Sequence, residues 1–327
     1  MPDSDQLPPP VPQVDPQSDS QPDSQPDPKV VLSPEAIARV QEGIAISQNP
    51  LVRQYIANDL AELSAIAAGT ADQRVGGRLR RWTMRRLIKS FFRVRIENPE
   101  NIPTEPNVLT ANHLSHLDPF LLLAFCPPYP YYYILGDART LYNKHWKRWL
   151  IGWAGGVIPL ERWWKEEMAV MAAADNGRDD LASLATDIRD HVPNGSSIQQ
   201  MRQIDQAVQA LLSRGDGIML FPEGRLGEQE GQMHLPLKRG TVLYAMRSGV
   251  PIYPVVIIGT KTLYFRKRLT LRFGPPVQVA HQTRPRRVDI DAALADLEQA
   301  FKALLPPNYQ EPQGPKLLSD WLNHLFW

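Results

Sequence analysis

Val108-Leu-Thr-Ala-Asn-His-Leu-Ser-His-Leu-Asp-Pro-Phe-Leu-Leu-Leu-Ala-Phe125 is the stretch that decides the fold. Residues 108–111 are apolar or β-branched, which indicates a short buried strand. Asp118 followed by Pro119 is typical of a helix start, because aspartate caps a helix and proline fits its first turn. The apolar run 119–125 therefore predicts a helix. A strand, a polar loop and a helix in succession are the unit from which α/β sheets are built.

The same alternation continues along the chain. Further strands are expected at 131–135, 157–160, 217–221, 252–258 and 269–273, with helices at 146–153, 201–212 and 241–248 between them. The pattern predicts an α/β fold with a mixed, mostly buried sheet covered by helices on both faces. The polar, weakly periodic segment 163–200 reads as an insertion.

Length and composition narrow the class of protein. The 327 residues, 43% of them hydrophobic, suit one large catalytic unit with appendages. No run of apolar residues approaches the 18 or more that a spanning helix needs, and the start Met-Pro-Asp-Ser-Asp is not typical of a secretory signal. A lone cysteine, Cys126, excludes an intrachain disulfide framework and a multi-cysteine zinc site. These features favour the cytoplasm, and we expect Cys126 to be inert because it follows an apolar helix.

Both ends of the chain differ from its centre. The first 28 residues hold six Asp, nine Pro and no Lys or Arg, so we expect residues 1–31 to be a disordered tail. Residues 32–98 are predicted to be helical, with Ser33 as a cap before Pro34. Residues 286–327 are expected to form C-terminal helices. The last of these would place Leu318, Trp321, Leu322 and Leu325 on one face, for docking on the body or for a membrane interface.

A basic amphipathic helix is expected at the end of the N-terminal segment. Residues 74–95 contain nine Lys or Arg and no acid. Their apolar residues recur at helical spacing: Met84, Leu87, Ile88, Phe91 and Phe92. Such a helix suits an interface with anionic lipid. The alternatives are packing of this stripe on the core and, with no recognised binding module beside it, nucleic-acid binding.

The loop after the first strand carries the clearest candidate chemistry. Asp118 has a plain structural interpretation as a helix cap. In the functional interpretation it reaches back to a ring nitrogen of His113, fixes the tautomer and stabilises the imidazolium as His113 takes a proton from an alcohol. General-base assistance of this kind contributes roughly 10²–10⁴-fold to a rate.

Three weaker motifs follow at the ends of later strands. Phe221-Pro-Glu-Gly-Arg225 offers a glycine for close backbone approach and an arginine fork for phosphate oxygens. Gly156-Val-Ile-Pro-Leu-Glu-Arg162 is a strand ending in another arginine, and Val250-Pro-Ile-Tyr-Pro-Val255 follows Lys238-Arg-Gly240. The first of these could be a turn with a surface ion pair, and the other two are weak by themselves.

The order and spacing of these three motifs and the His113–Asp118 motif resemble those of the glycerolipid acyltransferases of the lysophosphatidic acid acyltransferase superfamily. The resemblance covers about residues 95–280. The resemblance implies a glycerol-3-phosphate acyltransferase-like fold, with residues 99–285 as the catalytic domain. It implies His113 as the general base and Asp118 as the residue that orients it. Acceptor binding would fall to Asn112, Arg162, Glu223, Gly224 and Arg225, with Glu223 contacting glycerol hydroxyls or holding an arginine.

The implied reaction moves a fatty acyl group from acyl-CoA or acyl-carrier protein directly to the free hydroxyl of 1-acyl-glycerol 3-phosphate. The product would be phosphatidate, a phospholipid precursor, with no cofactor and no metal. The implied location is the cytoplasmic face of a membrane, as a peripheral or monotopic protein on an anionic surface. Glycerol 3-phosphate or another lysolipid remains an alternative acceptor, and a non-catalytic lipid-binding relative an alternative function.

Some features depart from the family pattern. Arg225 follows Gly224 directly where many members have a threonine between, and a lysine common between the first two motifs has no counterpart near 135–138.

A metal-dependent hydrolase is another alternative, because His113, His116 and Asp118 cluster. Its motif would need histidines at 114 and 119, where leucine and proline stand.

Overall fold

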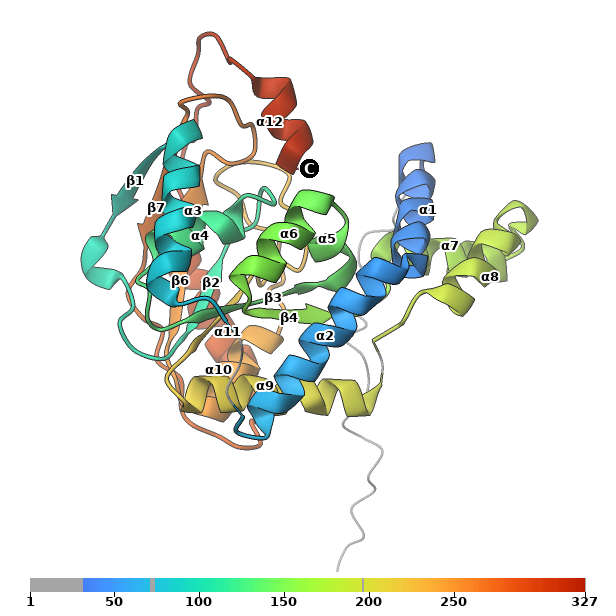
Figure 1. The fold of residues 1–327 in the computed structure, drawn as a ribbon, viewed down its shortest axis with the longest axis horizontal. Coiled ribbons are helices and arrows are strands. Elements are labelled where there is room, and N and C mark those ends of the chain that lie inside the picture. The colour runs from blue at the N-terminus through green and yellow to red at the C-terminus, as the bar shows by residue number, and fades with distance from the viewer. Residues whose placement is uncertain (1–31, 71–73, 196, 327) are drawn as a thin grey trace, which may run out of the picture.

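The computed structural model describes residues 32–70, 74–195 and 197–326, and the tail expected at 1–31 lies outside them. Its centre is a seven-stranded sheet of order β1-β7-β6-β2-β5-β3-β4 (Figure 1). Strands β2 to β6 run parallel, β7 is antiparallel to β6, and β1 is parallel to β7. The strands are β1 (Arg93–Glu97), β2 (Val108–Ala111), β3 (Tyr132–Asp137), β4 (Val157–Leu160), β5 (Gly217–Leu220), β6 (Ile252–Ile258) and β7 (Arg268–Phe273).

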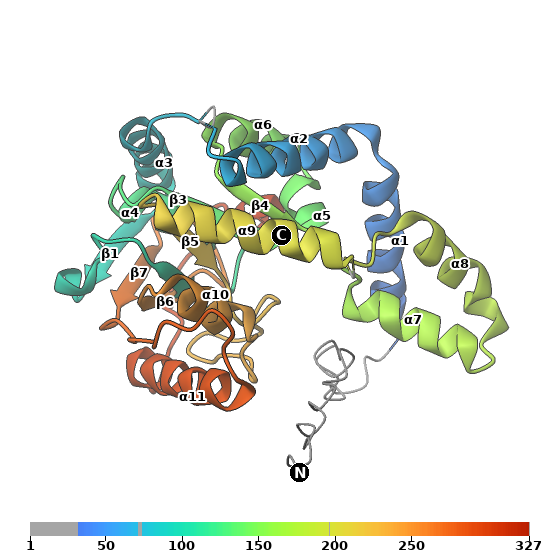
Figure 2. The same ribbon diagram turned by 90° about the horizontal axis from the view of Figure 1, so that it is seen from below.

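Helices cover both faces of this sheet (Figures 1 and 2). Leu109 points into an apolar cluster with α3, α4 and α6, whereas its neighbour Val108 points into a second cluster with α9, α10 and α11. This is the two-residue alternation of a strand buried on both sides. The helices are α1 (Pro34–Gln48), α2 (Pro50–Ala67), α3 (Gly77–Phe91), α4 (Asp118–Phe125), α5 (Ala138–Tyr142), α6 (His145–Ala154), α7 (Lys165–Asp175), α8 (Ala182–His191), α9 (Ile198–Ser213), α10 (Gly240–Ser248), α11 (Arg287–Leu304) and α12 (Ser319–Phe326).

The predicted fold class is confirmed, and the expected strands are present. The prediction of a helix over 74–95 is wrong at its C-terminal end, because residues 93–97 form β1. Val94 and Ile96 alternate with charged residues there, as on an edge strand with one exposed side. The charges made this strand look like a continuation of the basic helix.

The segment 163–200 contains two helices, α7 and α8, which pack against α1. Their shared apolar cluster includes Val40, Ile44, Val170 and Ile188. Figure 1 shows these three helices projecting beside the sheet, beyond the edge where β4 lies. A helical unit with its own small core therefore adjoins the carboxyl ends of β3 and β4.

The basic helix α3 divides its apolar residues between two environments. Met84 and Ile88 are buried in the core, so part of the apolar side of this helix packs on the sheet domain, as one of the alternatives predicted. Trp82, 58% exposed, and the exposed Leu79 and Leu87 face outward beside Arg86. α12 is divided in the same way, since Leu322 is buried while Trp321 is exposed, as are Leu317 and Leu318 just before the helix.

α3 and α12 are neighbours, with ring centroids of Phe91 and Trp321 6.0 Å apart (Figure 1). Among the described residues, no helix combines the length and apolar character needed to cross a bilayer.

Candidate active site

The loop after β2 brings His113 and Asp118 together, as the spacing predicted. Nδ1 of His113 lies 3.0 Å from Oδ2 of Asp118, and the carboxylate is fully buried at the start of α4. The same Oδ2 accepts backbone N–H groups from Leu114 at 2.7 Å and Ser115 at 2.9 Å. An ionised carboxylate only accepts hydrogen bonds, so this contact places the ring hydrogen on Nδ1. The lone pair of Nε2 is then available to take a proton.

Phe221, which follows β5, fixes the plane of that imidazole. The two rings stack with centroids 4.1 Å apart and planes 21° apart. The His113 side chain is 16% exposed, so it is not fully shielded from solvent. The sequence placed Phe221 in a motif but gave no sign of this contact.

His116 has a different environment from His113, although the two rings lie 6.1 Å apart. Burial and the nearby Lys147 lower the pKa of His116 to about 2, so it stays neutral. In the described part of the chain, His, Cys, Asp and Glu side chains form no group of three or more that could hold a metal ion.

Glu223 ties the loop after β5 to the loop after β2. It is 2% exposed, and its two oxygens accept the backbone N–H groups of His113 at 2.9 Å and His234 at 2.7 Å. Burial raises the pKa of this carboxyl. Each oxygen of Glu223 accepts one backbone N–H group, so the first role of this carboxylate is to join the two loops. Gly227 N–H donates to the carbonyl of His113 at 2.6 Å and strengthens the same connection.

Asn112 also differs from its expected role. Its side chain is fully buried and pairs with both backbone groups of Ile257, at 2.9 Å and 2.7 Å. Asn112 therefore fastens the loop to β6 and has no exposed surface for a substrate. These backbone partners lie 145 residues away in sequence, where spacing within a motif carries no information.

Arg162 and Gly224 form the second part of the site. Nη2 of Arg162 donates to the carbonyl of Gly224 at 2.9 Å, and Nε lies 3.5 Å from Asp137. Gly224 has φ +66°, in the left-handed region that favours glycine. A Cβ atom built on Gly224 would lie 3.3 Å from Cγ of Lys238 and 3.7 Å from Nη1 of Arg162. Two cationic side chains therefore flank this glycine, and the sequence did not single out Asp137 or Lys238 as part of it.

Arg225 is held by the loop that follows it. Its Nη2 lies 2.7 Å from Nδ1 of His234 and 3.4 Å from Glu228. The Arg225 side chain is about one-third exposed, so it is accessible to an anion. Arg162 and Arg225 thus lie on loops at the carboxyl ends of β4 and β5, the edge at which α/β proteins bind ligands.

The carboxyl ends of the parallel strands thus carry a carboxylate-oriented imidazole and two partly exposed arginines, groups that can accept a proton and contact an anion. The sequence model described as Acyltransferase matches residues 93–258, just over half of the chain. The chain belongs to this family.

Individual relatives have more specific names. A 1-acyl-sn-glycerol-3-phosphate acyltransferase of Limnanthes douglasii is 30% identical over 142 residues, which cover 41% of this chain and 47% of the relative. An enzyme of the same name from Chlamydomonas reinhardtii is 27% identical over 223 residues, 66% of this chain and 54% of the relative. The chain thus spans about half the length of the relatives it matches.

Among solved structures, the chain is similar to the 1-acyl-sn-glycerophosphate acyltransferase PlsC of Thermotoga maritima. The TM-score is 0.44 at 17% sequence identity, over 81% of this chain and 98% of the other.

Proposed function

We propose that this protein transfers a fatty acyl group from an acyl thioester to the free hydroxyl of 1-acyl-glycerol 3-phosphate, forming phosphatidate. The observation that carries the proposal is the contact between Nδ1 of His113 and the buried Asp118, which leaves Nε2 to act as the base. The relatives named 1-acyl-sn-glycerol-3-phosphate acyltransferase support the choice of acceptor.

In the proposed reaction, Nε2 of His113 accepts the proton of the acceptor hydroxyl as its oxygen attacks the thioester carbonyl. Asp118 stabilises the imidazolium that forms, because its carboxylate faces Nδ1. The C–S bond of the tetrahedral intermediate then breaks, and the thiolate leaves with the proton returned by the imidazolium. The products are the ester and the free thiol of coenzyme A or acyl-carrier protein.

The acceptor phosphate would bind near Gly224. Arg162 and Arg225 can supply charge-assisted hydrogen bonds to its oxygens, and these bonds are stronger than neutral ones. We assign Asn112 and Glu223 supporting roles, since their polar groups bind backbone. Glu223 holds the loops after β2 and β5 together, and Asn112 fastens the β2 loop to β6, so both help to set the distance between the base and the phosphate site.

The acceptor and product are lipids, so the enzyme would work at a membrane surface, on its cytoplasmic face. The outward residues of α3 and α12 suit that surface: Leu79, Trp82, Leu87 and Trp321 are apolar, and Arg78, Arg86 and Lys89 are basic. Arg80 is unsuitable because it is buried. α12 also reaches the site, since the carbonyl of Phe326 accepts the N–H of His116 at 3.3 Å.

The test is an acyl-transfer assay that crosses two donors, acyl-CoA and acyl-carrier protein, with several acceptors. We expect transfer to lysophosphatidate with at least one donor and poor transfer to the matching monoacylglycerol, which lacks the phosphate. Preferential use of glycerol 3-phosphate would change the acceptor assignment. If folded protein transfers no acyl group to any acceptor but binds the lipids, a non-catalytic lipid-binding function replaces the proposal.

A further inference from the structure

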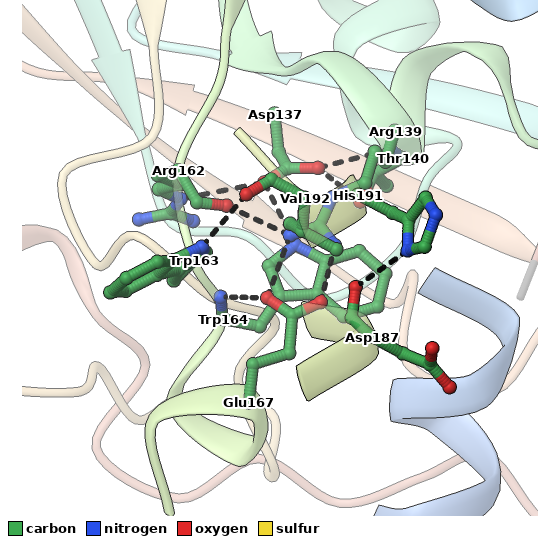
Figure 3. A network of polar contacts seen from close by, with 10 residues as sticks. All are labelled: Asp137, Arg139, Thr140, Arg162, Trp163, Trp164, Glu167, Asp187, His191 and Val192. Carbon is green, nitrogen blue, oxygen red and sulfur yellow. Dashed lines mark hydrogen bonds and ion pairs between the residues drawn. The ribbon is translucent and has the colours of Figure 1, made fainter. Parts of the chain in front are cut away.

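Asp137, the last residue of β3, stands at the centre of a polar network beside the proposed phosphate site (Figure 3). Its Oδ1 accepts the backbone N–H of Thr140 at 3.1 Å and so caps α5. Its Oδ2 accepts the indole N–H of Trp164 at 2.9 Å and lies 3.5 Å from Nε of Arg162. One carboxylate oxygen is therefore shared between an indole and the guanidinium of Arg162.

Trp164 is itself tightly held. Its ring contacts two guanidinium groups, with the ring centroid 4.0 Å from the guanidinium of Arg139 and 5.1 Å from that of Arg39. Its backbone N–H donates to Glu167 at 2.6 Å, and Glu167 is fully buried. Cation–π contacts and a buried acceptor leave the indole few orientations, so its N–H points at Asp137 in a fixed direction.

The same network holds the backbone of Arg162. Both oxygens of Glu167 bind Arg139, whose Nη2 also donates to the carbonyl of Arg162 at 2.8 Å (Figure 3). Arg139 and Glu167 are buried, and removing one partner of such a pair leaves an uncompensated charge. The start of α7 thus fixes both the backbone and, through Asp137, the guanidinium of Arg162.

The Arg162 side chain needs such support, because 45% of it is exposed and long charged side chains lose rotamer entropy when they are ordered. We infer that Trp164 is a positioning residue for acceptor binding: its indole N–H holds Asp137 in the place from which Asp137 presents the Arg162 guanidinium to the acceptor phosphate. This inference rests on the proposed function. It assigns to the segment 163–200 a role in acceptor affinity.

Without the indole N–H, the ion pair with Arg162 becomes the main interaction of Oδ2. The carboxylate would then draw the guanidinium toward itself, and the phosphate would have to compete with it. Acceptor binding should weaken while the chemistry at His113 stays the same. A structural role alone would instead lower stability or kcat without a selective effect on the phosphorylated acceptor.

The test compares Trp164→Phe with Trp163→Phe. The neighbouring indole of Trp163 donates to the carbonyl of Val192 at 3.0 Å, so the control removes an indole N–H from the same segment but not from Asp137. We expect Trp164→Phe to raise KM for lysophosphatidate about 3- to 10-fold with little change in kcat, as for a residue that acts through a neighbour. Trp163→Phe should leave KM unchanged, and thermal unfolding of both variants checks the fold.

The second step places Trp164→Phe in an Arg162→Ala background, where we expect it to add nothing to KM. Equal effects of the two tryptophan changes, or a full effect of Trp164→Phe without Arg162, would overturn the inference. Calorimetric titration with glycerol 3-phosphate measures phosphate binding apart from turnover. If the wild-type protein moves no acyl group, the proposed function fails, while weaker binding of this probe by Trp164→Phe alone would still support the positioning role.

Discussion

The two ends of the parallel strands both carry arginines, but in different environments. At the amino end, the guanidinium of Arg80 lies 3.5 Å from the centroid of the Tyr131 ring and donates to the carbonyl of Tyr132. Arg74 and Arg214 both pair with Asp216. At the carboxyl end, Arg162 and Arg225 are partly exposed and lie beside Gly224 and His234.

The difference indicates that burial and partners, rather than residue type, separate a structural arginine from one that is available to a ligand. Burial lowers the pKa of Arg80 to about 10, so it remains charged at neutral pH although it is only 4% exposed. Its guanidinium is stabilised by the face of Tyr131 and the carbonyl of Tyr132. Variants at the amino end should therefore change stability, and variants at the carboxyl end should change kcat or KM.

The largest expected effect is at the carboxyl end, in the variant His113→Ala. Loss of the proposed base should lower kcat about 10²–10⁴-fold. KM should change little, because the ring does not bind the phosphate. The assay is release of the free thiol from an acyl thioester in the presence of lysophosphatidate.

A matched control is His281→Ala, which removes an exposed histidine that follows β7. It should retain wild-type turnover. If His113→Ala is as active as this control, the proton-transfer role of His113 must be abandoned.

The next effect concerns stability at the amino end, in Arg80→Ala. This change removes the stacking on Tyr131 and the hydrogen bond to Tyr132, and it leaves a cavity. We expect a loss of about 3 kcal/mol in the free energy of unfolding, with KM unchanged. Urea unfolding and acyl-transfer kinetics together measure both quantities.

Arg162→Ala is the counterpart from the carboxyl end. Its stability should stay within about 0.5 kcal/mol, as for a surface substitution. KM for lysophosphatidate should rise about 10- to 100-fold, because a hydrogen bond to a charged group contributes about 1.5–3 kcal/mol. An equal rise in KM for a phosphate-free acceptor would refute the phosphate contact, and similar profiles for the two arginine variants would remove the distinction between the two ends.

Much of the fold could be predicted from the sequence, because buried parallel strands are short apolar runs between turn residues. β2, β4 and β6 begin and end where the apolar runs do. β1 was missed because its charged residues alternate with only two apolar ones. The helices in 163–200 were missed because their small core is completed by α1, more than a hundred residues earlier.

The site was predictable where one short motif supplies both partners. His113 and Asp118 are five residues apart in one strand–loop–helix unit, so their contact follows from local geometry. The backbone partners of Asn112 and Glu223 come from other strands and loops, which the motif does not specify. Asp137 and Trp164 acquire their role only because β3 and β4 are adjacent in the sheet.

Lys147 extends the comparison to a buried amine. It is 3% exposed, and its Nζ donates to the carbonyl of Thr140 at 3.1 Å. Burial and the nearby Lys144 lower the pKa of Lys147 from 10.5 to about 7. Between these two values the unfolded chain holds more protons than the folded chain, so stability should rise with pH in this window.

The wild type should therefore gain about 2 kcal/mol more than Lys147→Met between pH 7 and pH 9. Urea unfolding at a series of pH values measures this difference between the two proteins. Parallel curves would mean that Lys147 keeps its charge in the fold. It would then resemble Arg80, a buried cation that stays protonated.

The smallest expected effect concerns cations outside both ends of the sheet, on the outward face of α3. Arg86 is exposed and its guanidinium lies 5.4 Å from the ring of Trp82. Arg86→Gln should weaken binding to vesicles that contain anionic lipid by about 1 kcal/mol, the contribution of one basic residue near such a surface. Sedimentation with vesicles at low and high salt measures this loss, which should shrink as salt screens the charge.

The control is Lys302→Gln on α11, which packs on the other apolar cluster of the sheet. Both variants lose one exposed positive charge, so a general effect of net charge would weaken vesicle binding equally. A selective loss with Arg86→Gln would place the lipid surface on the α3 face. Equal losses, or binding that salt does not affect, would show that the exposed basic residues of α3 have no role in lipid binding. Binding of the acceptor would then depend on the arginines at the carboxyl end alone.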